Sequence, residues 1–271
     1  MPLALAAVLA GCAPRPAPGH LSVAAAADLQ FALEEVARGF RTEYPRTDLE
    51  IVYGSSGNFY TQIRNGAPFD VFLSADIEYP DKLIHDGFAV PASRFVYAVG
   101  RIALWTPANS GLDVERLHMQ VLEEDAVKHI AIANPQHAPY GRAAEAALRS
   151  LGVYDRVASK LVLGENIAQT LQFVQSGAAE VGIVALSLAL APQVRPQGRY
   201  WEIPLSAYPT MLQGGAILNR AAHAQPAAKF RAYLMSAPGR AILERYGFSI
   251  PQAGKAERAA PAGGRKTARA S

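Results

Sequence analysis

The chain has 271 residues, half of them hydrophobic, so it can bury a full core as one large domain or as two smaller ones. Its formal net charge is +3, but one basic residue lies in the leader 1–20, and five basic residues and one acidic residue lie in the tail 252–271. The body 21–251 therefore carries a net charge of −2. A nucleic-acid-binding protein should carry a basic patch on its folded body, so the composition argues against nucleic acid as a partner.

The two ends of the chain are expected to lie outside the fold. The N-terminus is a short apolar run that ends in small residues before a Pro-rich linker, which is typical of an export signal. Its LAGC sequence resembles the lipobox of bacterial lipoproteins, in which Cys12 is the acylated first residue of the mature protein. The alternative is an ordinary cleaved signal peptide with an incidental cysteine. The tail, rich in Ala, Gly and basic residues, is predicted to be disordered.

The first half of the body alternates strands and helices. A β-like run at 21–27 precedes Asp28, a good N-cap residue. Apolar residues then recur at the spacing of a helix with one buried face: Leu29, Leu33, Val36 and Phe40. A second strand at 49–53 leads into the turn Gly-Ser-Ser-Gly at 54–57 and a shorter helix, and a third strand follows at 70–74.

The same unit returns farther along the chain. Strands are predicted at 129–134, 160–164 and 181–186, with a helix after each of the first two. Strands that alternate with helices of this length indicate parallel sheets with helices on both faces. In such sheets, ligands lie beyond the carboxyl ends of the strands, where helices begin.

Four predicted helix starts are therefore candidates for a single site. A helix start presents unpaired backbone N–H groups and the positive end of the helix dipole, which together favour an anion. The four pairs of residues at these starts are Ala27-Asp28, Ser55-Ser56, Tyr140-Gly141 and Asn166-Ile167. Two of them lie in each half of the body.

Two β-rich segments, 94–107 and 208–219, are predicted to cross between the halves. This pattern indicates a bilobed α/β protein with a ligand cleft between the lobes. We place one lobe at 21–97 and 212–251, and the other at 98–211. A helix at 226–246 is expected to pack back on the first lobe.

At this point the residues match a known family. The motifs AAAADLQFAL, YGSSGNFYTQIRNGAPFDVFLSAD, IANPQHAPYGRAAEAAL, GENIAQTL and GIVALS together resemble the periplasmic molybdate-binding proteins of ABC importers. The resemblance covers about residues 21–251 in the same order. It implies the type II periplasmic-binding-protein fold: two lobes, each a mostly parallel sheet flanked by helices, with a tetrahedral oxyanion held in the cleft by N–H groups and hydroxyls.

The resemblance also implies which residues contact the ligand. The family's Ser or Asn after the Ala run falls on Asp28, with Ala27 just before it, and the second serine of its pair falls on Ser56. The residue after the proline of the family's turn falls on Tyr140, and the backbone donor after Glu-Asn falls on Ile167. A tyrosine that some members use at a fifth position is absent here, because that position is Ala185.

Asp28 is the departure from the family pattern, because a carboxylate aimed at a dianion would be repelled. We expect Asp28 to cap its own helix with its side chain turned away and to offer only its N–H to the anion. The alternative is that the protein binds another ligand, such as a cationic or zwitterionic solute.

Other chemistry finds little support in the sequence. The six histidines lie in no triad-like motif, and the helix starts bring only Asp28 and Glu165 as metal-ligating residues, so we expect neither an enzyme nor a metal site. We expect a monomeric periplasmic solute-binding protein without a cofactor, attached to the membrane only through a lipid on Cys12. By the resemblance, it captures molybdate, and also tungstate, and delivers it to an ABC permease and its ATPase. The alternatives are a binding protein for another oxyanion or small charged solute, and an effector-sensing domain.

Overall fold

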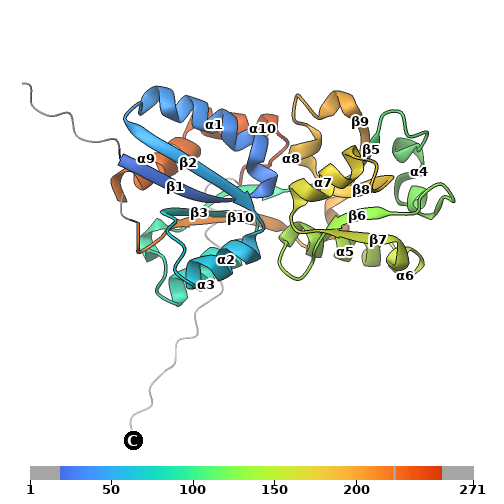
Figure 1. The fold of residues 1–271 in the computed structure, drawn as a ribbon, viewed down its shortest axis with the longest axis horizontal. Coiled ribbons are helices and arrows are strands. Elements are labelled where there is room, and N and C mark those ends of the chain that lie inside the picture. The colour runs from blue at the N-terminus through green and yellow to red at the C-terminus, as the bar shows by residue number, and fades with distance from the viewer. Residues whose placement is uncertain (1–18, 222–223, 252–271) are drawn as a thin grey trace, which may run out of the picture.

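The structure is a computed structural model that describes residues 19–221 and 224–251. It contains two five-stranded sheets side by side, each with helices on its faces, so the two-lobed α/β architecture is confirmed (Figure 1). In each sheet, one strand runs against the other four. The predicted leader, the tail and Cys12 lie outside the described residues, apart from Gly19 and His20, which begin the first strand.

The first sheet has the order β2-β1-β3-β10-β4. Its strands are β1 (Gly19–Ala26), β2 (Thr47–Gly54), β3 (Val71–Ser74), β4 (Phe95–Gly100) and β10 (Met211–Ile217), of which β10 is the reversed one. Its helices are α1 (Gln30–Glu43), α2 (Ser56–Arg64), α3 (Glu78–His85), α9 (Ala224–Met235) and α10 (Ala237–Arg245).

The second sheet has the order β7-β6-β8-β5-β9. Its strands are β5 (Ile102–Pro107), β6 (Ile130–Ala133), β7 (Leu161–Gly164), β8 (Val181–Ala185) and β9 (Gly198–Glu202), of which β5 is the reversed one. Its helices are α4 (Val114–Leu117), α5 (Pro139–Ser150), α6 (Tyr154–Val157), α7 (Ile167–Gln175) and α8 (Leu186–Ala189).

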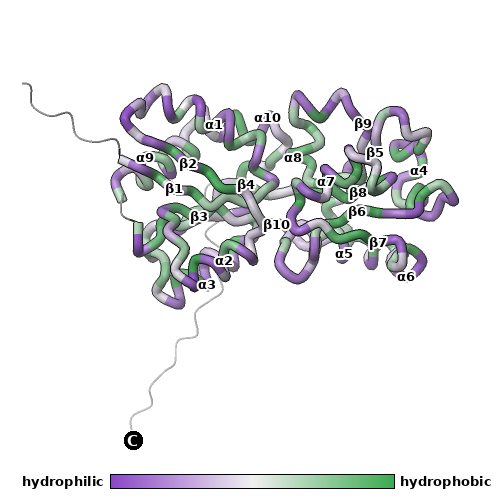
Figure 2. The backbone as a smooth tube through the Cα atoms, in the orientation of Figure 1, coloured by the Kyte–Doolittle hydropathy of each residue, from purple (hydrophilic) through white to green (hydrophobic). Residues whose placement is uncertain are grey.

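Hydrophobic burial follows the predicted periodicity. On α1 the buried residues are Ala32, Leu33, Val36, Ala37 and Phe40, which lie on one helical face. The inner strands of both sheets, among them β1, β3, β6 and β8, are buried almost throughout. Figure 2 shows this distribution, with hydrophobic residues along the central strands and hydrophilic residues on the outer turns. One hydrophobic cluster runs through both lobes, and a smaller one lies under α2 and α3.

The chain passes between the lobes in two short segments. The first is Arg101, between β4 and β5, and the second is the stretch 203–210 between β9 and β10. Hydrogen bonds hold the two crossings together. The N–H of Ile102, which follows Arg101 at the start of β5, donates to the Tyr208 hydroxyl, and the N–H of Ile203 donates to the Ile102 carbonyl. Arg101 also forms an ion pair with Glu202. Two adjacent crossings of this kind are the arrangement expected of a hinge.

The predicted helix at 226–246 is wrong as a single element. It is two helices, α9 and α10, which meet at Ser236. The Ser236 side chain accepts a hydrogen bond from the N–H of Gly239, and Pro238 lies in the first turn of α10. A serine cap followed by a proline is a helix-start signal, so the sequence held the information for this break. Within the described residues, no helix is long and apolar enough to cross a membrane.

Candidate functional site

A small cavity of about 10 Å³ lies where the two lobes meet. All five residues that were predicted to contact a ligand line it: Ala27, Asp28, Ser56, Tyr140 and Ile167. The remaining lining residues are Ala26, Gly54, Ser55, Ala75, Ala138, Pro139 and Asn166. The four predicted helix starts, two from each lobe, therefore converge on a single cavity.

The two serines that precede α2 differ in their hydrogen bonds. Ser55 is the N-cap residue, and its hydroxyl accepts from the N–H of Asn58 at 3.4 Å. The hydroxyl of Ser56 accepts from the buried N–H of Ala75 at 3.0 Å, so its own proton is free to be donated. Because Ser56 is the first residue of α2, its N–H also lacks an intrahelical partner. Ser56 thus brings two donors to the cavity wall.

The start of α7 has a similar arrangement in the second lobe. The Asn166 side chain caps the helix by accepting from the N–H groups of Ala168 and Gln169, both at 3.0 Å. The N–H of Ile167, the first residue of the helix, remains as a donor beside the cavity. An anion between Ser56 and Ile167 would face the positive ends of two helix dipoles, one from each lobe.

Asp28 is not the helix cap that the sequence predicted. It lies in a 3₁₀ turn, Ala27–Leu29, ahead of α1, and neither that turn nor α1 has a side-chain cap. Its carboxyl oxygen Oδ2 instead accepts from the Tyr140 hydroxyl at 2.9 Å and from Gln213 Nε2 at 2.7 Å. Tyr140 belongs to the second lobe, so this side chain makes long-range contacts that outweigh the local cap.

The Asp28 carboxyl is deeply buried, since only 1% of the residue is exposed. Burial is the main cause that raises the pKa of Asp28 to about 7. The hydrogen bonds from Gln213 and Tyr140 oppose it, followed by the nearby backbone N–H groups of Asp28 and Leu29. No nearby positive charge contributes to the shift. Its second oxygen, Oδ1, has no hydrogen-bond partner among the described residues. A buried carboxylate without a cation is costly, so the neutral acid is strongly favoured relative to an exposed aspartate.

Gln213 is a member of this cluster that the sequence analysis missed. Its Nε2 also donates to the Tyr140 hydroxyl at 3.0 Å, so it holds both partners of the contact between the lobes. It lies at a register shift in β10, next to Gly214. Gly100 makes room for the cluster, because a Cβ there would lie 2.5 Å from Gln213 Nε2 and 2.7 Å from the Tyr140 hydroxyl. In the sequence, Gln213 stands out only as a polar residue within the apolar run of β10, which does not indicate its role.

Further contacts between the lobes surround the cavity. The N–H of Gly57 donates to the His137 carbonyl at 2.9 Å, and Asn58 Nδ2 donates to Glu165 Oε1 at 3.2 Å. The Ser187 hydroxyl donates to the Asp28 carbonyl at 2.7 Å. The structure therefore has its lobes closed on each other.

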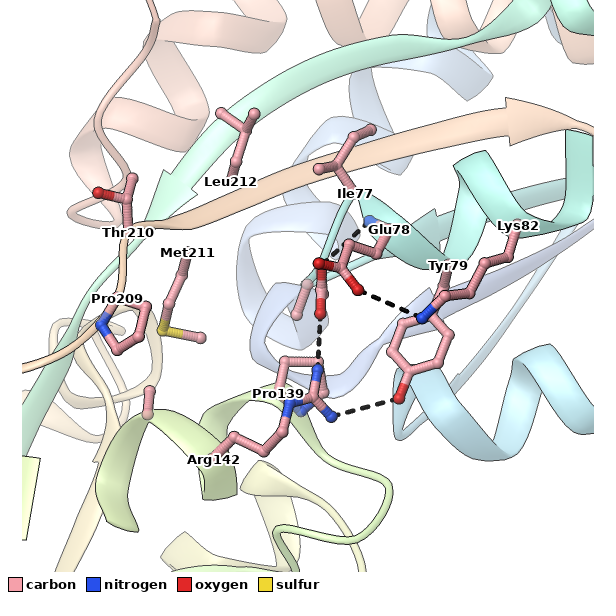
Figure 3. Close-up of a pocket in the computed structure, with 13 residues that line it drawn as sticks. Ile77, Glu78, Tyr79, Lys82, Pro139, Arg142, Pro209, Thr210, Met211 and Leu212 are labelled. Atoms are coloured by element: carbon pink, nitrogen blue, oxygen red, sulfur yellow. Dashed lines mark hydrogen bonds and ion pairs between the residues drawn. The ribbon is translucent and has the colours of Figure 1, made fainter. Parts of the chain in front are cut away.

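A larger pocket adjoins the cavity at Ala75 and Pro139. Arg142 crosses this pocket from the second lobe, with its guanidinium 2.6 Å from Asp76 Oδ2 and 3.3 Å from the Tyr79 hydroxyl. Figure 3 shows the Arg142 guanidinium pointing toward the Tyr79 hydroxyl, with a dashed line between them. Asp76 also accepts from the N–H of Glu78 at 3.0 Å, as expected for a residue at the start of α3. No group of three His, Cys, Asp or Glu residues within the described ranges could hold a metal ion.

Comparison with known proteins decides the family. The model for bacterial extracellular solute-binding proteins matches residues 21–249, which is nearly all of the folded body. The chain belongs to this family.

Two curated relatives of this solute-binding protein are particularly similar. The molybdate-binding protein ModA of Azotobacter vinelandii is 38% identical over 250 residues, covering 92% of this chain and 96% of the relative. The ModA protein of Rhodobacter capsulatus is also 38% identical, covering 89% and 93% of the two chains. Among solved structures, the periplasmic molybdate-binding protein of Azotobacter vinelandii has a TM-score of 0.80 at 35% identity, covering 86% of this chain and 100% of that one. The resemblance that the motifs carried is thereby confirmed.

Proposed function

We propose that this solute-binding protein captures molybdate, and also tungstate, outside the cytoplasm and delivers it to an ABC importer. The observation that carries the proposal is the convergence of Ala27, Asp28, Ser56, Tyr140 and Ile167 on one small cavity between the lobes. Its relatives in Azotobacter and Rhodobacter, similar over almost their full length, are molybdate-binding proteins.

The cavity offers dispersed donors rather than a fixed cation. The Ser56 hydroxyl and the N–H groups of Ser56 and Ile167 would donate to the oxygens of a tetrahedral oxyanion. Hydrogen bonds from neutral donors to an ionised acceptor are shorter and stronger than those between neutral groups. Closure of the lobes excludes water, and this strengthens each contact further. Discrimination against sulfate would come from the size of the cavity, since the hydrogen-bonding chemistry of the two anions is alike.

Transport requires binding and release without a chemical reaction, so we propose no catalytic role and no cofactor. We propose that the protein acts as a monomer in the periplasm and passes its ligand to a membrane permease coupled to an ATPase. Cys12 is proposed to anchor it through a lipid.

Isothermal titration of the purified protein with molybdate, tungstate, sulfate and phosphate tests this function. Molybdate and tungstate should bind without an added metal, and sulfate and phosphate should bind more weakly. Absence of binding by both molybdate and tungstate would refute the assignment. Preferential binding of sulfate or phosphate would support the alternative of another oxyanion.

A further inference from the structure

We propose that the solute-binding protein takes up one proton on the Asp28 carboxyl when it binds its oxyanion, so that the anion rests against a neutral acid. This inference rests on the proposed function, because it concerns the ligand of the same cavity. It goes further by making Asp28 a carboxyl group that is protonated when the anion binds. Neither a helix cap nor a cation-binding carboxylate would have this role. The proton comes from solvent, and no bond in the anion is broken.

The geometry of the Asp28 cluster supports this inference. Asp28 lines the cavity, is buried, and offers Oδ2 to donors from Tyr140 and Gln213. Its Oδ1 has no partner among the described residues and is the oxygen left to carry a proton. An ionised Asp28 would add an acceptor and a negative charge to a wall that must receive an anion. A protonated Oδ1 would replace that acceptor with a donor.

Within the described part of the chain, no other group near Asp28 could neutralise its charge. The titratable groups that face Asp28 are the buried hydroxyls of Tyr140 on α5 and Tyr97 on β4, and burial is the main cause that raises the pKa of both well above the usual value, with the Asp28 charge adding to it. Helices α7 and α8, which pack on the turn that holds Asp28, carry no titratable side chain. Between α1 and β2, Glu34 and Tyr53 are bonded to each other at 2.9 Å.

The contact between the lobes connects the proton to closure. Tyr140 reaches Asp28 from the second lobe, so separation of the lobes would remove this donor and its share of the cover over the carboxyl. Burial raises the pKa of Asp28 from 3.8 to about 7. An opened cleft would expose the carboxyl to water and return its pKa toward the ordinary value. Closure on the anion therefore favours proton uptake at neutral pH, and a lower pH favours closure on the anion.

Titration calorimetry with molybdate at pH 8, in two buffers of different ionisation enthalpy, measures the uptake directly. If only the protonated form binds, and the pKa of Asp28 is about 7 without the anion, the wild type should take up about 0.9 proton per anion. Its Kd should weaken at least about tenfold between pH 6 and pH 8. An Asp28 whose pKa is lower in the open protein would give an uptake closer to one proton and a steeper dependence.

Two variants complete the test. Asp28→Asn should bind molybdate with a pH-independent Kd and no proton uptake, because its amide cannot titrate. Asp76→Asn is the matched control, since it removes a carboxylate from the lobe junction but not from the cavity wall, and it should retain the uptake. The comparison cancels any proton chemistry of molybdate itself, which is the same for every variant.

Wild-type binding at pH 8 without buffer-dependent heat would overturn the inference, as would uptake that persists in Asp28→Asn. Loss of molybdate binding by a folded Asp28→Asn protein at both pH values would also overturn it, because the carboxyl would then have a role that an amide donor cannot replace. Failure of the wild type to bind molybdate at either pH would refute the proposed function itself.

Discussion

Substitution of the two serines at the start of α2 separates a ligand contact from a structural cap. Ser56→Ala removes a hydroxyl whose proton is free to reach the cavity, whereas Ser55→Ala removes only the cap on Asn58. A hydrogen bond to a charged group contributes about 1.5–3 kcal/mol. Loss of the Ser56 hydroxyl should therefore weaken molybdate binding by about 10-fold to 140-fold.

Both substitutions should also reduce the stability of the unliganded protein, which makes them a matched pair. Ser56→Ala leaves the buried N–H of Ala75 without its partner, at a cost of about 1–3 kcal/mol in the free energy of unfolding. Ser55→Ala loses a helix cap, at a cost of about 0.5–2 kcal/mol. Titration calorimetry gives the affinities, and chemical denaturation gives the stabilities. Equal, small losses of affinity in the two variants would refute the placing of Ser56 at the ligand.

Three further predictions concern pH, closure and anchoring. The pKa of Asp28 is about 7 when buried and 3.8 when unfolded, so its contribution to the free energy of unfolding should fall as pH rises from about 4 through 7. In denaturation experiments at pH 8, Asp28→Asn should be more stable than the wild type by up to about 4 kcal/mol. Equal pH profiles of stability for the two proteins would contradict this. A Cβ on Gly57 would lie 2.6 Å from the His137 carbonyl of the other lobe, so Gly57→Ala should hinder closure and weaken molybdate binding at least about tenfold. Its melting temperature should be unchanged or higher. An unchanged affinity for molybdate would show that this contact does not govern closure. Cys12→Ser should move the protein from the membrane fraction to the soluble periplasmic fraction, and mass spectrometry should find a lipid on Cys12 of the wild type. A wild-type protein that is soluble and cleaved at another position would exclude the lipid anchor.

The convergence of the four helix starts could be predicted because it follows from local patterns and one general rule. Apolar periodicity located the strands and helices, and parallel strands bring the helix starts at their carboxyl ends to a common edge. Ser56 and Ile167 needed only this rule and the family motifs to be placed at the cavity. The cap on α7 was likewise readable, since Asn166 stands directly before the first apolar residue of the helix.

The orientation of Asp28 could not be predicted in this way. A local rule makes aspartate before a helix a cap, but this side chain takes partners 112 and 185 residues away along the chain. Long-range packing decides which partners the Asp28 side chain takes. One of these partners, Gln213, lies within the apolar run of β10, where no sequence pattern indicates its role. The break between α9 and α10 at Ser236 could have been predicted, because a serine followed by a proline two residues later is a helix-start signal. The apolar periodicity continues across the break, and this favoured a single helix.

The most direct test of oxyanion binding at the lobe junction is a crystal structure of the protein with molybdate, measured at the molybdenum absorption edge. The structure predicts a single anomalous peak in the cavity between Ser56 and Ile167, within hydrogen-bonding distance of both backbone N–H groups and of the Ser56 hydroxyl. A peak elsewhere on the protein, with this cavity empty in closed lobes, would contradict the proposed site.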